Sequence, residues 1–153
     1  MARRRSVERM ITNISLASIF VKDIDASKAF YIDVLGFEEH TDITLGDGYR
    51  WCTVKHPSQP ELQVHLTKPG PPFSPEMADA IDRSLDEGGM NGLGLAVDDC
   101  QKTFEELVAK GVEFLQEPAE RPYGVEAVCR DNSGNWMVLV EQRPFTGDDV
   151  DHA

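Results

Sequence analysis

Histidines and carboxylates are the side chains of this 153-residue chain best suited to catalysis or metal binding. The histidines are His40, His56, His65 and His152. A divalent cation needs three or four nitrogen, oxygen or sulfur donors that converge on one point. Because no two of these histidines form an H-x-x-x-H pair or a similar cluster, the spacing predicts no metal centre of the usual kind.

Other catalytic motifs are also incomplete. Residues 92–94 begin like a dinucleotide-binding loop but lack its third glycine, and no serine lies in a G-x-S-x-G turn. The cysteines, Cys52, Cys100 and Cys129, include no C-x-x-C pair and indicate neither a disulfide framework nor a zinc site. We expect Cys52 and Cys129 to be buried as small hydrophobic groups, the usual state of a free cysteine.

The composition is that of a globular protein with one domain, since 41% of the residues are hydrophobic and 27% are charged. The net charge of −12 repels phosphate backbones and anionic lipids, so we expect neither nucleic acid nor a membrane as a partner. No apolar stretch of the kind found in signal peptides follows the arginines at 3–5. Together with the unpaired cysteines, this predicts a cytoplasmic location.

An internal repeat organises the elements that must position these side chains. Residues 16–23 and 92–99, offset by 76 positions, both alternate apolar residues and end in an acidic residue. This pattern predicts a half-buried strand that leads into a helix. The first helix follows Asp23 or Asp25 and ends at Gly36, and the second follows Asp99 and ends at Gly111.

Each predicted helix is followed by stretches with the character of strands, separated by turn residues. In the first half they cover residues 37–45, 50–55 and 62–67, with a turn at 57–60; in the second they cover 112–116, 125–130 and 135–141, with a turn at 118–122. The unit reads β-α-β-β-β twice, which predicts an α+β fold. Between the copies, Ser74 and Pro75 predict the start of an amphipathic helix that continues to about Asp86.

The chain resembles the vicinal oxygen chelate superfamily, which includes glyoxalase I, bleomycin-resistance proteins and extradiol dioxygenases. The resemblance lies in residues 21–31, 35–37, 97–99 and 130–136 and extends over residues 11–142. It implies module one at 11–67, a linker at 68–90 and module two at 91–142. Outside this domain we expect flexible ends at 1–10 and 146–153. The resemblance also implies a cup-shaped, half-barrel mixed sheet with the helices outside, and a homodimer.

Metal enzymes of this superfamily carry one ligand on each of four strands. The corresponding positions here are Leu16, Gln63, Gly92 and Val138. Three of these side chains hold no donor atom, and the nearly equal offsets, 76 from Leu16 to Gly92 and 75 from Gln63 to Val138, predict the same register in both modules. We therefore expect no metal and no other cofactor, unless a displaced centre forms from His65, Glu61, Glu126 and Glu141.

Strand alternation also predicts which side chains face the implied cleft. The candidate ligand-binding residues are aromatic or polar: Phe20, Trp51, Gln63, His65, Tyr123, Glu126 and Trp136. Flat apolar area with a few polar groups is typical of small-molecule sites, although the same aromatic residues could simply fill the cup. We expect a protein that binds or sequesters an aromatic or amphipathic small molecule. The alternative is a metal-dependent lyase or dioxygenase whose rearranged centre uses His65 and Glu126.

Overall fold

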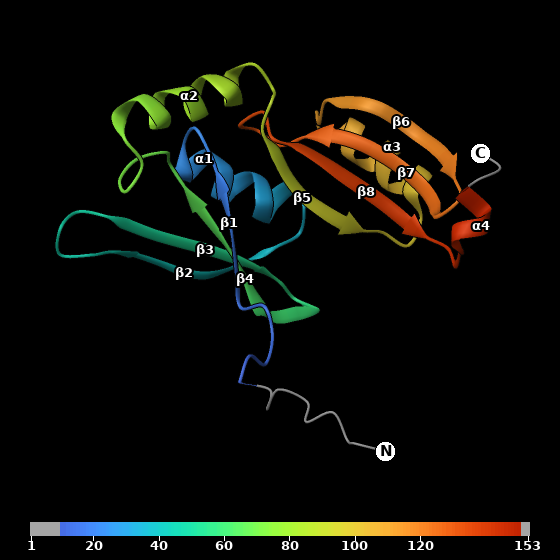
Figure 1. Cartoon of the computed structure of the whole chain (residues 1–153), viewed down its shortest axis with the longest axis horizontal. Coiled ribbons are helices and arrows are strands. Elements are labelled where there is room, and N and C mark those ends of the chain that lie inside the picture. The colour runs from blue at the N-terminus through green and yellow to red at the C-terminus, as the bar shows by residue number, and fades with distance from the viewer. Residues whose placement is uncertain (1–9, 151–153) are drawn as a thin grey trace.

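The computed structural model describes residues 10–150, with side chains to Asp148, and contains two modules of the same topology (Figure 1). Module one comprises β1 (Leu16–Phe20), α1 (Ile24–Ala29), η1 (Phe30–Val34), β2 (Glu38–Thr44), β3 (Arg50–His56) and β4 (Gln59–Thr67). Module two comprises β5 (Asn91–Ala96), α3 (Cys100–Ala109), β6 (Phe114–Arg121), β7 (Gly124–Arg130) and β8 (Trp136–Gln142). Helix α2 (Pro75–Asp86) lies between the modules in sequence, and α4 (Gly147–Val150) follows β8.

Each module contributes one open, four-stranded mixed sheet. The strand orders are β1-β4-β3-β2 and β5-β8-β7-β6, and in each sheet the first strand pairs in parallel with the last strand of its module. This confirms the α+β class and the repeated β-α-β-β-β unit. In the part of the chain that the structure describes, no strand of one sheet is paired with a strand of the other.

Acidic side chains start the helices where the sequence predicts. An Asp23 carboxylate oxygen accepts a hydrogen bond from the Ala26 amide at 2.9 Å, and Asp99 accepts one from the Lys102 amide at 3.0 Å. Ser74 caps α2 in the same way, so the predicted linker helix is confirmed. The first helix differs from expectation, because η1 is a π-helical turn. Over five residues, apolar spacing does not separate a π-turn from an α-turn.

Two strands extend through segments predicted as turns. Strand β4 starts at Gln59 and includes Pro60, and β6 continues through Pro118 to Arg121. The register shifts on both sides of Gln116, and β6 is the outer strand of its sheet. Proline lacks an amide donor, but an outer strand or an irregular register accommodates it.

The hydrophobic core lies on the faces of the sheets that the helices cover. Its buried residues on the strands, and at Val21 directly after β1, are Ile19, Val21, Cys52, Val54, Val64, Leu66, Ala127, Cys129, Met137 and Leu139. These are the alternate positions predicted to face the helices, and the predicted burial of Cys52 and Cys129 is confirmed. Residues one position away, including His65 and Trp51, therefore belong to the opposite faces.

A buried polar cluster joins the modules around Asp131 in the turn before β8. Its carboxylate accepts hydrogen bonds from the Tyr31 hydroxyl at 2.8 Å, the backbone amides of Ser133 and Asn135 at 2.9 and 3.0 Å, and the Asn135 side chain at 2.9 Å. Asn135 Nδ2 also donates to the Phe20 carbonyl at 2.8 Å. Burial, followed by the neighbouring Asp131 charge, raises the pKa of Tyr31 above its usual value, so its hydroxyl keeps its proton. Side chains from both modules thus hydrogen-bond to one another inside a shared core, where among these groups only Asn135 Oδ1 has no partner in the described residues.

The same turn fixes the end of α2. Arg130 Nη1 donates to the carbonyls of Gly88 and Gly134 at 3.0 Å each. Gly134 has a φ of +101°, and a Cβ built there would lie 2.3 Å from the Leu85 carbonyl oxygen. Only glycine suits this close approach. Among residues 10–150, no helix is long and apolar enough to cross a membrane.

Candidate functional site

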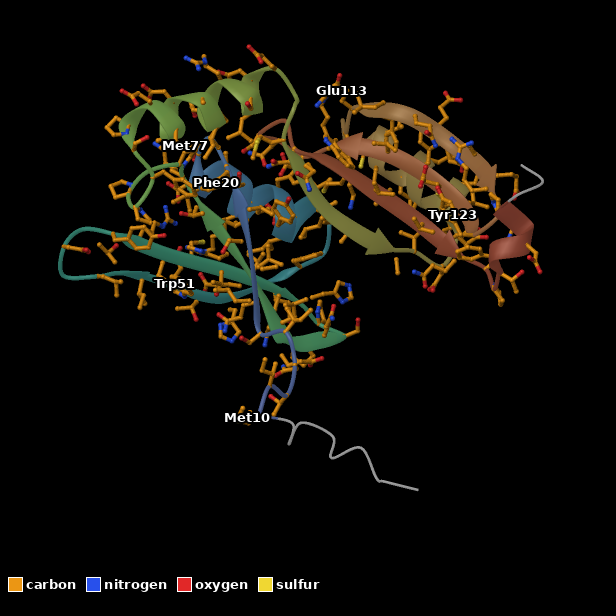
Figure 2. The ribbon with its side chains drawn as sticks, viewed as in Figure 1. Met10, Phe20, Trp51, Met77, Glu113 and Tyr123 are labelled. Atoms are coloured by element: carbon orange, nitrogen blue, oxygen red, sulfur yellow. The ribbon has the colours of Figure 1, made fainter. Side chains whose placement is uncertain are left out.

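The seven predicted ligand-binding residues fall into two groups, one on each sheet. Phe20, Trp51, Gln63 and His65 lie on module one, whereas Tyr123, Glu126 and Trp136 belong to module two. Figure 2 shows Phe20 and Trp51 over the strands of module one, with Tyr123 on the far side of module two. We call the sheet face that bears Ser18, Phe20, Trp51, Thr53, Gln63, His65 and Thr67 the open face of module one.

His65 is the centre of the open face of module one. Its imidazole stacks on the Trp51 ring, with 4.2 Å between the centroids and 26° between the planes. Nδ1 lies 3.3 Å from the Ser18 hydroxyl and Nε2 lies 3.1 Å from the Tyr49 hydroxyl. His65 is only 7% exposed, and this burial lowers the pKa of its imidazole below the ordinary value. The result is a neutral, hydrogen-bonded ring beside a half-buried tryptophan.

Polar and aromatic neighbours complete this face. The buried Thr53 hydroxyl donates to Gln63 Oε1 at 3.0 Å. Phe20 meets Phe73, from the segment before α2, edge to face at a centroid distance of 5.6 Å. Phe73 and Tyr49 were not among the predicted site residues, because both lie in connecting segments where strand alternation gives no direction.

Module two presents a carboxylate held by its neighbours. The Tyr123 hydroxyl donates to Glu126 Oε2 at 2.5 Å, and Arg121 Nε lies 3.7 Å from Glu126 Oε1. The hydrogen bond to Glu126 raises the pKa of Tyr123 above its usual value. Trp136 begins β8 and is 37% exposed. His65 lies on the sheet of module one and Glu126 on the sheet of module two. The rearranged metal centre of the alternative function, which uses both residues, therefore does not form on a single sheet.

The positions that correspond to metal ligands pair differently in the two modules. Leu16 pairs with Gln63 as expected, but Val138 pairs with Gly94, because the register shifts between Asn91 and Gly94. The prediction of equal registers is therefore wrong, and a shift of this kind depends on strand pairing that sequence spacing does not reveal. In either register, the leucine, valine and glycine side chains offer no atom to a metal ion.

The residues proposed for a displaced centre have other partners or lie apart. Glu141 Oε1 accepts the amide hydrogen of Cys100 at 3.0 Å, at the start of α3. Glu126 is bound to Tyr123, and Glu61 is exposed on β4. Within the described residues, no three histidine, cysteine, aspartate or glutamate side chains are grouped so that they could hold a metal ion. The residues present do not fit the metal that the resemblance implies for the enzymes of the superfamily.

A cleft lies between the modules, on the side of the sheets opposite the open face of module one. This cleft has a volume of about 510 Å³, and its lining includes Leu62, Val64, Leu93 and Leu95 with Lys110 at its border. Leu62 and Val64 alternate with Gln63 and His65 on β4, so this cleft and the open face of module one use opposite strand faces. Its walls are mainly aliphatic, whereas the open face of module one combines stacked rings with hydroxyl groups.

Protonation of His65 should make the fold less stable in acid. An unfolded histidine binds a proton near pH 6.5, whereas the lowered pKa keeps the folded His65 neutral to a lower pH. As the pH falls below 6.5, the unfolded state therefore binds more protons and the free energy of unfolding decreases. Urea denaturation at pH 7.5 and 5.5 should show a smaller acid-induced loss for His65→Gln than for the wild type. The exposed His40→Gln should behave like the wild type; an equal loss in all three proteins would contradict this role of His65.

Both sequence and structure resemble known proteins along almost the whole chain. Residues 13–139 match the sequence pattern of the Glyoxalase/Bleomycin resistance protein/Dioxygenase superfamily. YurT of Bacillus subtilis (strain 168) is 30% identical over 129 residues, which cover 84% of this chain and 98% of YurT. The crystal structure of UcmS2 superposes with a TM-score of 0.80 at 40% identity, covering 87% of this chain and 100% of UcmS2. TnmS3, an antibiotic-binding protein from Streptomyces sp. CB03234, superposes with a TM-score of 0.69 at 26% identity, covering 88% of this chain and 98% of TnmS3.

Proposed function

Because this chain belongs to the Glyoxalase/Bleomycin resistance protein/Dioxygenase superfamily, we propose that it binds and sequesters an aromatic or amphipathic small molecule without a metal ion. The observation that carries this proposal is the open face of module one, where Trp51 and the buried His65 form a stacked pair beside hydroxyl groups. Rings supply affinity through contact area, and a few polar atoms orient the ligand.

The similarity to TnmS3 supports a binding role, since that protein is described as antibiotic-binding and its structure covers both modules. The net charge of −12 and the Glu126 carboxylate favour a neutral or cationic ligand over an anionic one. The buried free cysteines suit a reducing compartment, and we place this activity in the cytoplasm.

A homodimer would complete the site in this proposal. Leu16 is 40% exposed and Ile43, the cross-strand partner of Trp51, is 50% exposed. Strands β1 and β5 each lie at one edge of their sheet, so each leaves backbone groups free to pair. A second copy would cover these side chains and enclose the ligand between an open face of module one and the sheet of module two.

Metal analysis and a ligand screen test this function. The protein is purified without chelator, its metal content is measured, and its thermal unfolding is followed with a panel of aromatic antibiotics, with and without EDTA. We expect no stoichiometric metal, and we expect a rise in Tm with at least one compound that EDTA does not change. A ligand present at about 100 times its Kd would stabilise the fold by about 2.7 kcal/mol. Stoichiometric Ni, Zn, Mn or Fe, or stabilisation that EDTA abolishes, would instead favour the metal-dependent enzyme.

A further inference from the structure

Four hydrogen-bonding side chains form a continuous chain across the open face of module one. The Ser18 hydroxyl lies 3.3 Å from His65 Nδ1, and His65 Nε2 lies 3.1 Å from the Tyr49 hydroxyl. The Tyr49 hydroxyl lies 3.1 Å from that of Thr67, which donates to the Lys68 carbonyl at 3.4 Å. The series of hydrogen bonds therefore extends from the exposed Ser18 to the backbone carbonyl that follows β4.

The carbonyl sets the direction of this chain. A carbonyl only accepts, each hydroxyl donates one proton, and a neutral imidazole has one donor and one acceptor nitrogen. With Thr67 donating to Lys68, Tyr49 donates to Thr67 and accepts from His65 Nε2–H, which leaves Nδ1 to accept from Ser18. The opposite direction forms one internal hydrogen bond fewer, because the Lys68 carbonyl then receives no proton from Thr67.

The surroundings of His65 favour a neutral ring. Its contacts from β1, β3 and the turn before β3 are Ser18, Trp51 and Tyr49, none of which carries a charge at neutral pH. The lowered pKa of the imidazole agrees with this environment. The neutral imidazole therefore donates one hydrogen bond and accepts one, so the hydrogen bonds on its two sides point in the same direction.

We propose that this directed chain makes the open face of module one a hydrogen-bond acceptor that selects planar aromatic ligands bearing a hydroxyl or amino donor. Ser18 is exposed and donates its own proton inward to His65, so its oxygen presents lone pairs to a ligand. The half-buried Trp51, which stacks on His65, supplies flat surface for the aromatic ring. This inference rests on the proposed function and specifies the chemical class of the ligand.

Two matched probes test the selection. 2-Naphthol carries a hydroxyl donor, whereas 2-methoxynaphthalene has the same ring without the donor. In NMR titrations we expect 2-naphthol to bind about 5- to 10-fold more tightly, the value of one added hydrogen bond. Ser18→Ala should abolish this preference and leave the affinity for 2-methoxynaphthalene unchanged. The exposed Ser58→Ala, on the β3–β4 turn, should retain the wild-type preference.

A second measurement, made without any ligand, determines the tautomer of His65 and with it the direction of these hydrogen bonds. The ¹⁵N and ¹H correlations of the His65 ring should identify the Nε2–H tautomer in the wild type. Tyr49→Phe removes the acceptor for that proton and should shift the ring toward the Nδ1–H tautomer. An Nδ1–H ring in the wild type would overturn the proposed direction.

The outcomes separate this inference from the proposed function. If both naphthalenes bind with equal affinity, or if Ser18→Ala keeps the preference, the aromatic site stands and the selection rule is overturned. If neither probe binds, the proposed aromatic site itself fails, and the rule for ligands fails with it.

Discussion

Replacement of Asp131 by alanine should lower the free energy of unfolding by about 3 kcal/mol or more. The substitution removes the acceptor of four hydrogen bonds, from the Tyr31 hydroxyl, the Ser133 amide, and the backbone and side-chain amides of Asn135. Asp131, Tyr31 and Asn135 are all buried, so water does not replace the lost carboxylate without entering the core. Urea denaturation followed by circular dichroism measures the change.

Two further variants show whether the decrease in the free energy of unfolding comes from the buried cluster around Asp131. Asp33→Ala removes an exposed carboxylate from η1 and should change stability by less than about 0.5 kcal/mol. Asp131→Asn keeps one acceptor oxygen and should lie between Asp131→Ala and the wild type. Because Tyr31 belongs to module one and Asp131 to module two, we expect one cooperative transition in the wild type. A fully stable Asp131→Ala would show that this cluster does not hold the modules together.

Local patterns predicted the individual modules well. The acids at 23 and 99 cap their helices, and the alternation of residues 17–21 and 93–97 gives the correct buried faces. The errors lie where partners distant in sequence decide the outcome. Pro118 was placed in a turn, but a register shift on an outer strand accommodates it. The pairing of Val138 with Gly94 likewise depends on the neighbouring strand.

The site, like the fold, was predicted correctly only where neighbours close in sequence decide the structure. Alternation correctly gives Trp51 and His65 the same face, but it does not tell how far that face lies from Glu126 on the other sheet. The placement of the sheets depends on buried contacts such as Tyr31 with Asp131, which appear in the sequence only as isolated polar residues. Tyr49 was missed because its turn has no periodicity, although its hydroxyl meets both His65 and Thr67.

Replacement of Trp51 by alanine should weaken the binding of 2-methoxynaphthalene about 5- to 150-fold, since stacking of a flat ring on an aromatic side chain contributes about 1–3 kcal/mol. This probe lacks the donor that Ser18 would accept, so the experiment isolates the contribution of the ring. Trp51→Phe keeps an aromatic surface and should retain most of the affinity. NMR titration measures binding, and circular dichroism checks that each variant is folded.

The aliphatic cleft between the modules supplies the competing location for the same probe. Leu62 lines that cleft and lies on β4 one position before Gln63, so its side chain points away from the open face of module one. Leu62→Ala should therefore bind 2-methoxynaphthalene as tightly as the wild type. The opposite pattern, with affinity lost in Leu62→Ala and kept in Trp51→Ala, would move the ligand to the cleft. The stacked Trp51–His65 pair would then be a structural feature of the sheet, because a ring bound between the modules touches the other face of β4.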